Sequence, residues 1–173
     1  MKSVLIVIAK KNFRDEEFLE PKKVFIDEKF EVAIASTEPG KCVGKLGTIV
    51  NADVSIYDVD EKDYDAIVFV GGLGSLVYEN DEKVHDLIKN FIKSGKIVAS
   101  ICISPRILIK AGVLKDKRFT MWNSDGSQDI FIKKSGGVYT GENVTVDEKI
   151  ITANGPHSAH KFGKEISNLL KII

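Results

Sequence analysis

The chain has 173 residues and carries 25 basic and 25 acidic side chains, so its formal net charge at neutral pH is zero. This balance argues against a polyanionic partner, and we expect no binding to nucleic acid. With 43% hydrophobic and 29% charged residues, the composition is typical of a globular protein, and we expect one domain spanning residues 1–173.

Strand-like and helix-like segments alternate along the chain. Apolar runs predict strands at residues 3–9, 31–36, 65–70, 96–101, 138–139, 144–146 and 150–152. Apolar residues at helical spacing predict helices at residues 15–27, 82–93, 105–111, 127–134 and 158–170. Pro21 predicts a kink or an irregular turn in the first helix. Residues 42–56, which are richer in Gly and Val, predict a small hairpin at the sheet edge. This alternation predicts an α/β fold, with a parallel sheet and helices on both faces.

The cellular setting is inferred from the cysteines and from the apolar run at residues 4–9. Cys42 and Cys102 form no Cys-x-x-Cys pair, so free thiols in a reducing compartment are the simpler interpretation. The apolar run is too short to span a bilayer and lacks the cleavage pattern of a signal peptide. We therefore expect a cytoplasmic protein that does not bind a membrane. No cluster has metal-ligand spacing, so we expect no metal site.

The most informative stretch joins a strand that ends before Cys102 to a helix that begins at Pro105. Proline suits the first turn of a helix, and Gly112 suits its end. Cys102 is therefore expected in a turn of about two residues, at the carboxyl end of the sheet and over the positive end of a helix. This is a nucleophile elbow with sulfur in place of oxygen, and its thiol should ionise more easily than a free one. A small core cysteine is the alternative.

Glu17 is expected to reach the same edge, because parallel strands end on the same side of a sheet. A protonated Glu17 would donate to the Cys102 thiolate and lower the pKa of the thiol. The alternative is a solvated residue in an acidic first turn, which the helix dipole favours.

A further strand ends in Gly71-Gly72-Leu73-Gly74. Glycines leave room for backbone amides that, together with the amide of Ile103, can form an oxyanion hole. A simple tight turn is the alternative. The segment is neither a dinucleotide fingerprint nor a phosphate-binding loop, so no cofactor is expected.

His157 is the best candidate for a catalytic base. It follows the strand at residues 150–152, so its loop can reach the edge that carries Cys102. A role at the surface is the alternative.

Together these motifs resemble the ThiJ/PfpI superfamily over essentially the whole chain. The similar segments are residues 4–9, 17–21, 70–72, 99–102 with Pro105, 111–114 and 151–156. The resemblance implies a flavodoxin-like three-layer sandwich and homodimers or higher oligomers. It also implies a reactive Cys102, a carboxyl partner at Glu17, and oxyanion or substrate contacts at Gly72, Leu73 and Ile103.

The chain departs from the family pattern near the cysteine. PfpI-type peptidases carry histidine directly after the cysteine, where this chain has Ile103, and the family's usual next glycine is Ser104. Leu76 stands where PfpI-type members have an acidic residue. Trp122 stands where deglycase members often have histidine, and we expect it to border the substrate site. An adjacent Cys-His-acid triad is absent, which weighs against a peptidase unless His157 supplies the base.

We expect a cysteine-dependent enzyme that acts on reactive carbonyls or their protein adducts, as glyoxalases and deglycases do. In this hypothesis the Cys102 thiolate adds to an aldehyde, Glu17 moves a proton, and the amides hold the oxyanion. A redox-responsive chaperone or stress protein with an oxidisable Cys102, and a PfpI-type intracellular peptidase, are the alternatives. The expected partners are a small carbonyl substrate or a damaged protein, and a second copy of the chain.

Overall fold

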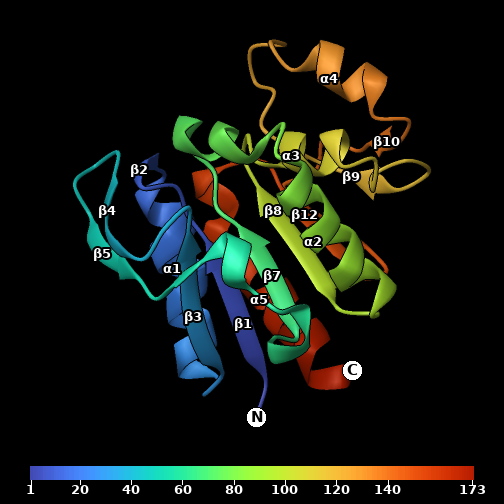
Figure 1. Ribbon diagram of the computed structural model, residues 1–173. Coiled ribbons are helices and arrows are strands. Elements are labelled where there is room, and N and C mark those ends of the chain that lie inside the picture. Colours follow the sequence, from blue (N-terminus) through green and yellow to red (C-terminus); the bar gives the residue numbers. More distant parts are fainter.

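A seven-stranded sheet forms the centre of the molecule in the computed structural model, which describes residues 1–173 (Figure 1). Its strands are β1 (Ser3–Val7), β3 (Glu31–Ser36), β6 (Val54–Ser55), β7 (Ala66–Phe69), β8 (Ile97–Ile101), β11 (Val144–Asp147) and β12 (Ile150–Ala153). They lie in the order β11-β12-β8-β7-β1-β3-β6, and every neighbouring pair is parallel except β11 and β12. The predicted, mostly parallel α/β sheet is confirmed.

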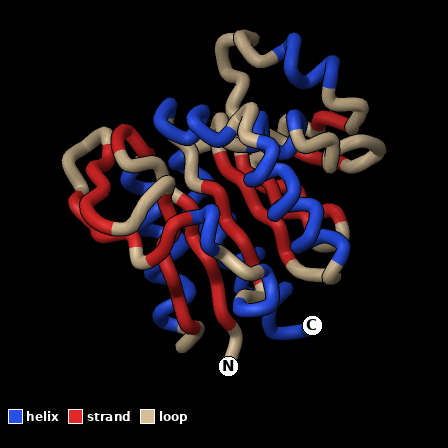
Figure 2. The backbone as a smooth tube through the Cα atoms, viewed as in Figure 1, coloured by secondary structure: helices blue, strands red, loops and turns tan.

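Helices cover both faces of this sheet, which gives three layers (Figure 2). The helices are α1 (Asp15–Asp27), α2 (Glu82–Lys93), α3 (Pro105–Lys110), α4 (Asp129–Lys134) and α5 (Ala159–Ile172). Short 3₁₀ turns are η1 (Ile56–Asp58), η2 (Glu61–Asp63), η3 (Leu73–Tyr78) and η4 (Pro156–Ser158). Helices α1 and α5 pack together on one face, and α2 and α3 cover the other. None of the helices is long and apolar enough to cross a lipid bilayer.

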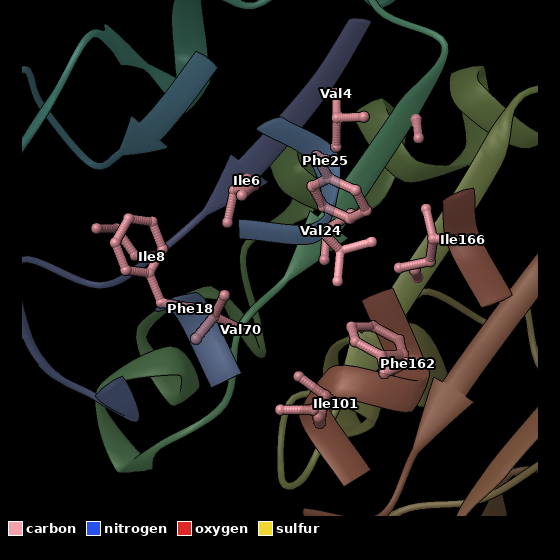
Figure 3. Close-up of a cluster of buried hydrophobic side chains, with 14 of the residues drawn as sticks. Val4, Ile6, Ile8, Phe18, Val24, Phe25, Val70, Ile101, Phe162 and Ile166 are labelled. Carbon is pink, nitrogen blue, oxygen red and sulfur yellow. The ribbon is translucent and has the colours of Figure 1, made fainter. Parts of the chain in front are cut away.

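Two hydrophobic clusters fill the spaces between the layers. Side chains alternate along β1, so Val4 and Ile6 enter one cluster while Leu5 and Val7 enter the other. Figure 3 shows the first cluster, where residues of β1 meet Phe18, Val24, Phe25, Phe162 and Ile166 of α1 and α5. Burial on both faces explains why the central strands are continuous apolar runs in the sequence.

The expected hairpin forms, but its expected position at the edge of the main sheet is wrong. Strands β4 (Gly40–Gly44) and β5 (Ile49–Ala52) pair antiparallel and join β2 (Lys11–Phe13) in a separate sheet. The edge of the seven-stranded sheet next to β3 is formed by β6 instead. The buried Asp15 carboxylate holds the hairpin near the start of α1, accepting from the amides of Leu46 (2.7 Å) and Thr48 (2.9 Å). A second small sheet pairs β9 (Arg118–Phe119) with β10 (Val138–Tyr139).

Helix α1 is continuous through Pro21, so the expected irregular turn is absent. Pro21 is buried against α5, where a Cβ atom added at Gly163 would lie 2.8 Å from the Pro21 Cα. Because proline lacks the N–H that an inner helical position would use, close packing against α5 compensates for the missing hydrogen bond.

Candidate active site

Cys102 occupies a sharp turn between β8 and α3. Its φ angle is +65°, in the left-handed region that costs an L-residue about 1–2 kcal/mol. Two backbone hydrogen bonds of 2.9 Å hold the turn: Cys102 N donates to the Ala153 carbonyl, and Trp122 N donates to the Cys102 carbonyl. The predicted elbow is therefore present, and its strained backbone is held by neighbouring segments.

The Ser104 side chain holds this elbow in place through buried hydrogen bonds. Its buried hydroxyl lies 2.7 Å from the Ser100 hydroxyl, accepts from Ile101 N at 3.1 Å, and lies 2.8 Å from the carbonyls of Phe69 and Ile101. These contacts connect the nucleophile turn to both β7 and β8. From the sequence, Ser104 was notable only as a departure from the family's glycine, and no local pattern indicates this role.

Glu17 lies in the first turn of α1 and is completely buried. Its Oε2 accepts from the backbone N of Gly71 at 2.8 Å, while its Oε1 is buried without a hydrogen-bond partner. Burial raises the pKa of Glu17 to about 7, against the lowering effects of Cys102, the Gly71 amide and the Arg14 charge. The alternative interpretation of Glu17 as a solvated residue is therefore wrong, and the carboxyl is half-protonated near neutral pH.

Gly71 is what allows Glu17 and Cys102 to approach each other. A Cβ atom added at Gly71 would strike Oε2 of Glu17 and lie 2.7 Å from the Cys102 Cβ. The same atom would lie 2.8 Å from the Ile101 carbonyl oxygen. Any side chain at this position would therefore push the carboxyl away from the nucleophile turn.

The thiol of Cys102 is less acidic than the sequence predicted. Burial raises its pKa, and the charge of the Glu17 carboxylate raises it further. The backbone amides of Ile103 and Gly72 point at the sulfur and act in the opposite direction. The expected easily ionised thiol is wrong, because burial alone opposes the thiolate and a charged Glu17 in the same buried site opposes it further. The two groups therefore titrate as a pair.

Gly72 and Leu73 follow Gly71 in the chain, just after β7. Gly72 has φ of +89°, and an added Cβ would lie 2.5 Å from the Asn12 carbonyl oxygen and 2.6 Å from Arg14 N, so only glycine fits. Leu73 begins η3, and the residue is 67% exposed. Ile103, by contrast, is buried.

Trp122 adjoins the elbow through its backbone N, and it lines a cavity of about 460 Å³ with His157, Tyr139 and Asn154. A Cβ added at Gly155 would lie 3.5 Å from the His157 ring and 3.9 Å from Trp122 Cδ1. The His157 side chain is exposed and makes no hydrogen bond to Cys102 or Glu17. No group of three or more His, Cys, Asp or Glu side chains is placed to hold a metal ion.

The fold and the cysteine elbow define a flavodoxin-like α/β protein of the ThiJ/PfpI kind. The chain belongs to the DJ-1/PfpI family, which it matches over residues 2–169. It is 32% identical to the deglycase TK1284 from Thermococcus kodakarensis over 167 residues, which is 96% of this chain and 99% of that protein. It is 27% identical to the glutathione-independent glyoxalase DJR-1.2 from Caenorhabditis elegans over 172 residues, covering 98% and 89% of the two chains.

A solved structure shows the same architecture. The crystal structure of a ThiJ/PfpI domain protein from Brachyspira murdochii matches with a TM-score of 0.94 and 33% identity, over 99% of this chain and 97% of that one. The family and fold expected from the sequence are confirmed.

Proposed function

We propose that the protein is a cysteine-dependent enzyme that acts on reactive carbonyls or their protein adducts, in the manner of a glyoxalase or deglycase. One observation carries the proposal: a buried carboxyl with a pKa of about 7 lies beside a cysteine in a strained elbow. A group that titrates near neutral pH can both accept and return a proton in one turnover. The deglycase and glyoxalase names of relatives support the same chemistry.

The reaction with methylglyoxal can be written without a cofactor. The Cys102 sulfur adds to the aldehyde carbon, the thiol proton passes to the Glu17 carboxylate, and the amides of Gly72 and Ile103 stabilise the new oxyanion. Glu17 returns that proton to the oxyanion, and its carboxylate then removes the proton on the former aldehyde carbon, which leaves an enediolate. Glu17 gives this second proton to the neighbouring carbon, while the hydroxyl proton on the first carbon passes to the enediolate oxygen, and a lactoyl thioester results. Water then hydrolyses the thioester, releasing lactate and restoring the thiol. The sum is methylglyoxal plus water giving lactic acid.

The direct test follows methylglyoxal consumption and lactate formation by the purified protein. We expect turnover in the wild type and none in Cys102→Ala or Cys102→Ser. Cys42→Ser is the matched control, because Cys42 is fully buried on β4 in the separate three-stranded sheet, outside the Cys102 turn, and should leave the rate intact. Absence of turnover in the wild type, or equal rates in Cys102→Ala, would refute the proposal.

A redox-sensing stress protein is the second candidate. Cys102 is partly exposed, and the protonated form of Glu17 can donate a hydrogen bond to a sulfinate formed by peroxide oxidation of the thiolate. Mass spectrometry after mild peroxide treatment separates the two candidates. Selective gain of two oxygen atoms at Cys102, together with no carbonyl turnover, would favour the sensor.

A peptidase is the weakest candidate. Peptide hydrolysis needs a proton donor for the leaving amine, and the residue next to the nucleophile is Ile103. His157 is the imidazole that the sequence favours as a base, but its ring is exposed and makes no hydrogen bond to Cys102. Casein hydrolysis that is lost in His157→Ala would support a peptidase, whereas equal rates in the two proteins would dismiss His157.

We also propose a cytoplasmic location and a homodimer or higher oligomer. The free thiols of Cys42 and Cys102 suit a reducing compartment. Leu46 and Ile49 expose 63% and 64% of their surfaces on one hairpin, as apolar side chains at a subunit contact would in an isolated chain. Light scattering with Leu46→Glu tests the contact, and an unchanged mass would exclude this hairpin from it.

A further inference from the structure

We propose that the cavity lined by Trp122, Tyr139 and His157 is a subsite for a neutral, polyhydroxylated carbon chain attached to the reactive carbonyl. The inference rests on the proposed function for the identity of the reacting carbonyl. Binding of the hydroxylated chain does not depend on that function. The cavity begins at Trp122, whose backbone N donates to the carbonyl of the nucleophile Cys102. The cavity wall therefore adjoins the Cys102 turn at Trp122, and the proposed subsite would take the chain that extends from a carbonyl held at Cys102.

The size of the cavity favours a substrate larger than methylglyoxal. Its volume of about 460 Å³ falls within the usual range for small-molecule sites. At about 30 Å³ for each liquid water, it would hold on the order of fifteen waters, far more than a three-carbon carbonyl displaces.

The chemistry of the wall favours neutral hydroxyl groups. No lysine, arginine, aspartate or glutamate lines the cavity, so no fixed charge would hold a phosphate or carboxylate tail. The hydroxyls of Tyr139 and Ser124, the Trp122 indole N–H and the His157 ring make no hydrogen bond within the chain. An apolar ligand would bury these groups without partners, whereas a polyol can bond them and place its C–H groups against the aromatic rings.

Two asparagines hold the wall in shape. Asn123 donates to Asp129 Oδ1 and accepts from Gln128 N, both at 2.8 Å. Asn154 donates to Asn143 Oδ1 at 3.2 Å and accepts from the Ser158 hydroxyl at 2.7 Å. Because these side chains already have partners, the cavity is formed before a ligand arrives, which lowers the entropic cost of binding.

Binding can be measured without turnover, because Trp122 is the only tryptophan in the chain. We would titrate the wild-type protein with D-glucitol, an unreactive neutral polyol, and follow tryptophan fluorescence. A saturable change at millimolar concentration is expected, with hexan-1-ol and lactate giving none. Tyr139→Phe should weaken binding about fivefold, the effect of losing one neutral hydrogen bond.

Tyr57→Phe is the matched control for that titration. The Tyr57 hydroxyl is bonded to Asp81 (2.7 Å) away from this cavity, so the same chemical change there should leave glucitol binding unaltered. No saturable change with glucitol, or an equal loss of affinity in both variants, would overturn the subsite.

Turnover then tests whether the subsite selects substrates. We would compare kcat/KM for 3-deoxyglucosone, a six-carbon dicarbonyl with a hydroxylated tail, with kcat/KM for methylglyoxal. The ratio should favour 3-deoxyglucosone and fall about fivefold in Tyr139→Phe. A fructosyl-lysine peptide assayed in parallel distinguishes a protein-linked polyol from the free compound.

The two proposals fail in different ways. Methylglyoxal turnover with no polyol binding would refute the proposed subsite and leave the proposed enzymatic function standing. Polyol binding with no carbonyl turnover would support the proposed subsite and refute the proposed enzymatic function.

Discussion

The Glu17 carboxyl and the Cys102 side chain flank Gly71 so closely that one carbon atom added at that glycine would meet both. The site therefore contains two acidic groups in one buried space, and each disfavours the charge of the other. Below the Glu17 pKa of about 7 the carboxyl is neutral and its charge no longer raises the pKa of Cys102, but burial still does, and the amides of Ile103 and Gly72 act against burial. This pairing makes Glu17 the residue whose replacement is most informative.

Glu17→Gln should lower the pKa of Cys102 and yet reduce carbonyl turnover. The variant removes the carboxylate charge that raises the thiol pKa, while the two amides that lower it remain. It also removes the group that carries the proton, a loss of about 100-fold or more in rate. Iodoacetamide alkylation of the Cys102 peptide across pH, read by mass spectrometry, measures the first effect.

Glu20→Gln is the control for both measurements, since Glu20 is an exposed residue of the same helix and is not among the groups that shift the pKa of Glu17 or Cys102. Slower alkylation of Glu17→Gln than of wild type at neutral pH would contradict the proposed coupling.

Glu17 should also make folding stability depend on pH. Because burial raises its pKa from 4.5 to about 7, the folded protein keeps a proton that the unfolded chain has already released. Stability should therefore fall as pH rises through this interval, by on the order of 3 kcal/mol at about 1.4 kcal/mol per pKa unit. Urea unfolding at about pH 5 and about pH 8 should show this loss in the wild type and a smaller one in Glu17→Gln. Equal losses would mean that the carboxyl is not the cause.

Local patterns in the sequence predicted much of the fold. The predicted bounds of helices at 15–27 and 82–93 and of the strand at 31–36 agree with α1, α2 and β3. Apolar spacing specifies these elements because each buries one face or both. Likewise, Pro105 after an apolar run was enough to place Cys102 in its turn.

The properties of the site were less predictable because they depend on residues far apart in the chain. The burial of Glu17 requires Gly71, which is 54 positions away and belongs to the end of another strand. The raised pKa of Cys102 follows from that burial and reverses the expectation drawn from the helix dipole alone. The separate sheet of the hairpin depends on the Asp15 carboxylate, whose partners Leu46 and Thr48 lie about thirty residues further on.

Ser104→Ala should destabilise the protein by about 1–3 kcal/mol, since the amide of Ile101 and the hydroxyl of Ser100 would lose a buried partner. The elbow would also lose its hydrogen bond to the Phe69 carbonyl on β7, so the dependence of the Cys102 alkylation rate on pH should broaden or shift. Urea unfolding and alkylation measure the two effects. Ser94→Ala, at an exposed serine after α2, should leave both unchanged. A loss no larger than that of Ser94→Ala would show that Ser104 does not support the turn.

Arg106 of α3 and Glu79 form an ion pair, and replacing only one of the two residues should lower the stability of the protein strongly. Arg106 Nη2 lies 2.6 Å and 2.7 Å from the two carboxylate oxygens, and the Glu79 side chain is only 8% exposed. The guanidinium also lies 3.7 Å from the centre of the Phe131 ring, which connects α3 to α4. Arg106→Met would leave the carboxylate buried and uncompensated, a loss of about 3–5 kcal/mol.

Adding Glu79→Gln to Arg106→Met should restore part of this loss, because the neutral amide is cheaper to bury than an unpaired carboxylate. Unfolding free energies of the two single variants and the double variant form the necessary cycle. Lys117→Met, which removes the partner of the exposed Glu148, is the control and should cost about 1 kcal/mol or less. If the double variant is no more stable than Arg106→Met, the carboxylate must reach water once its partner is gone. In that event the pair would contribute through the Phe131 contact that holds α4 against α3, and Phe131→Ala should then reproduce the loss.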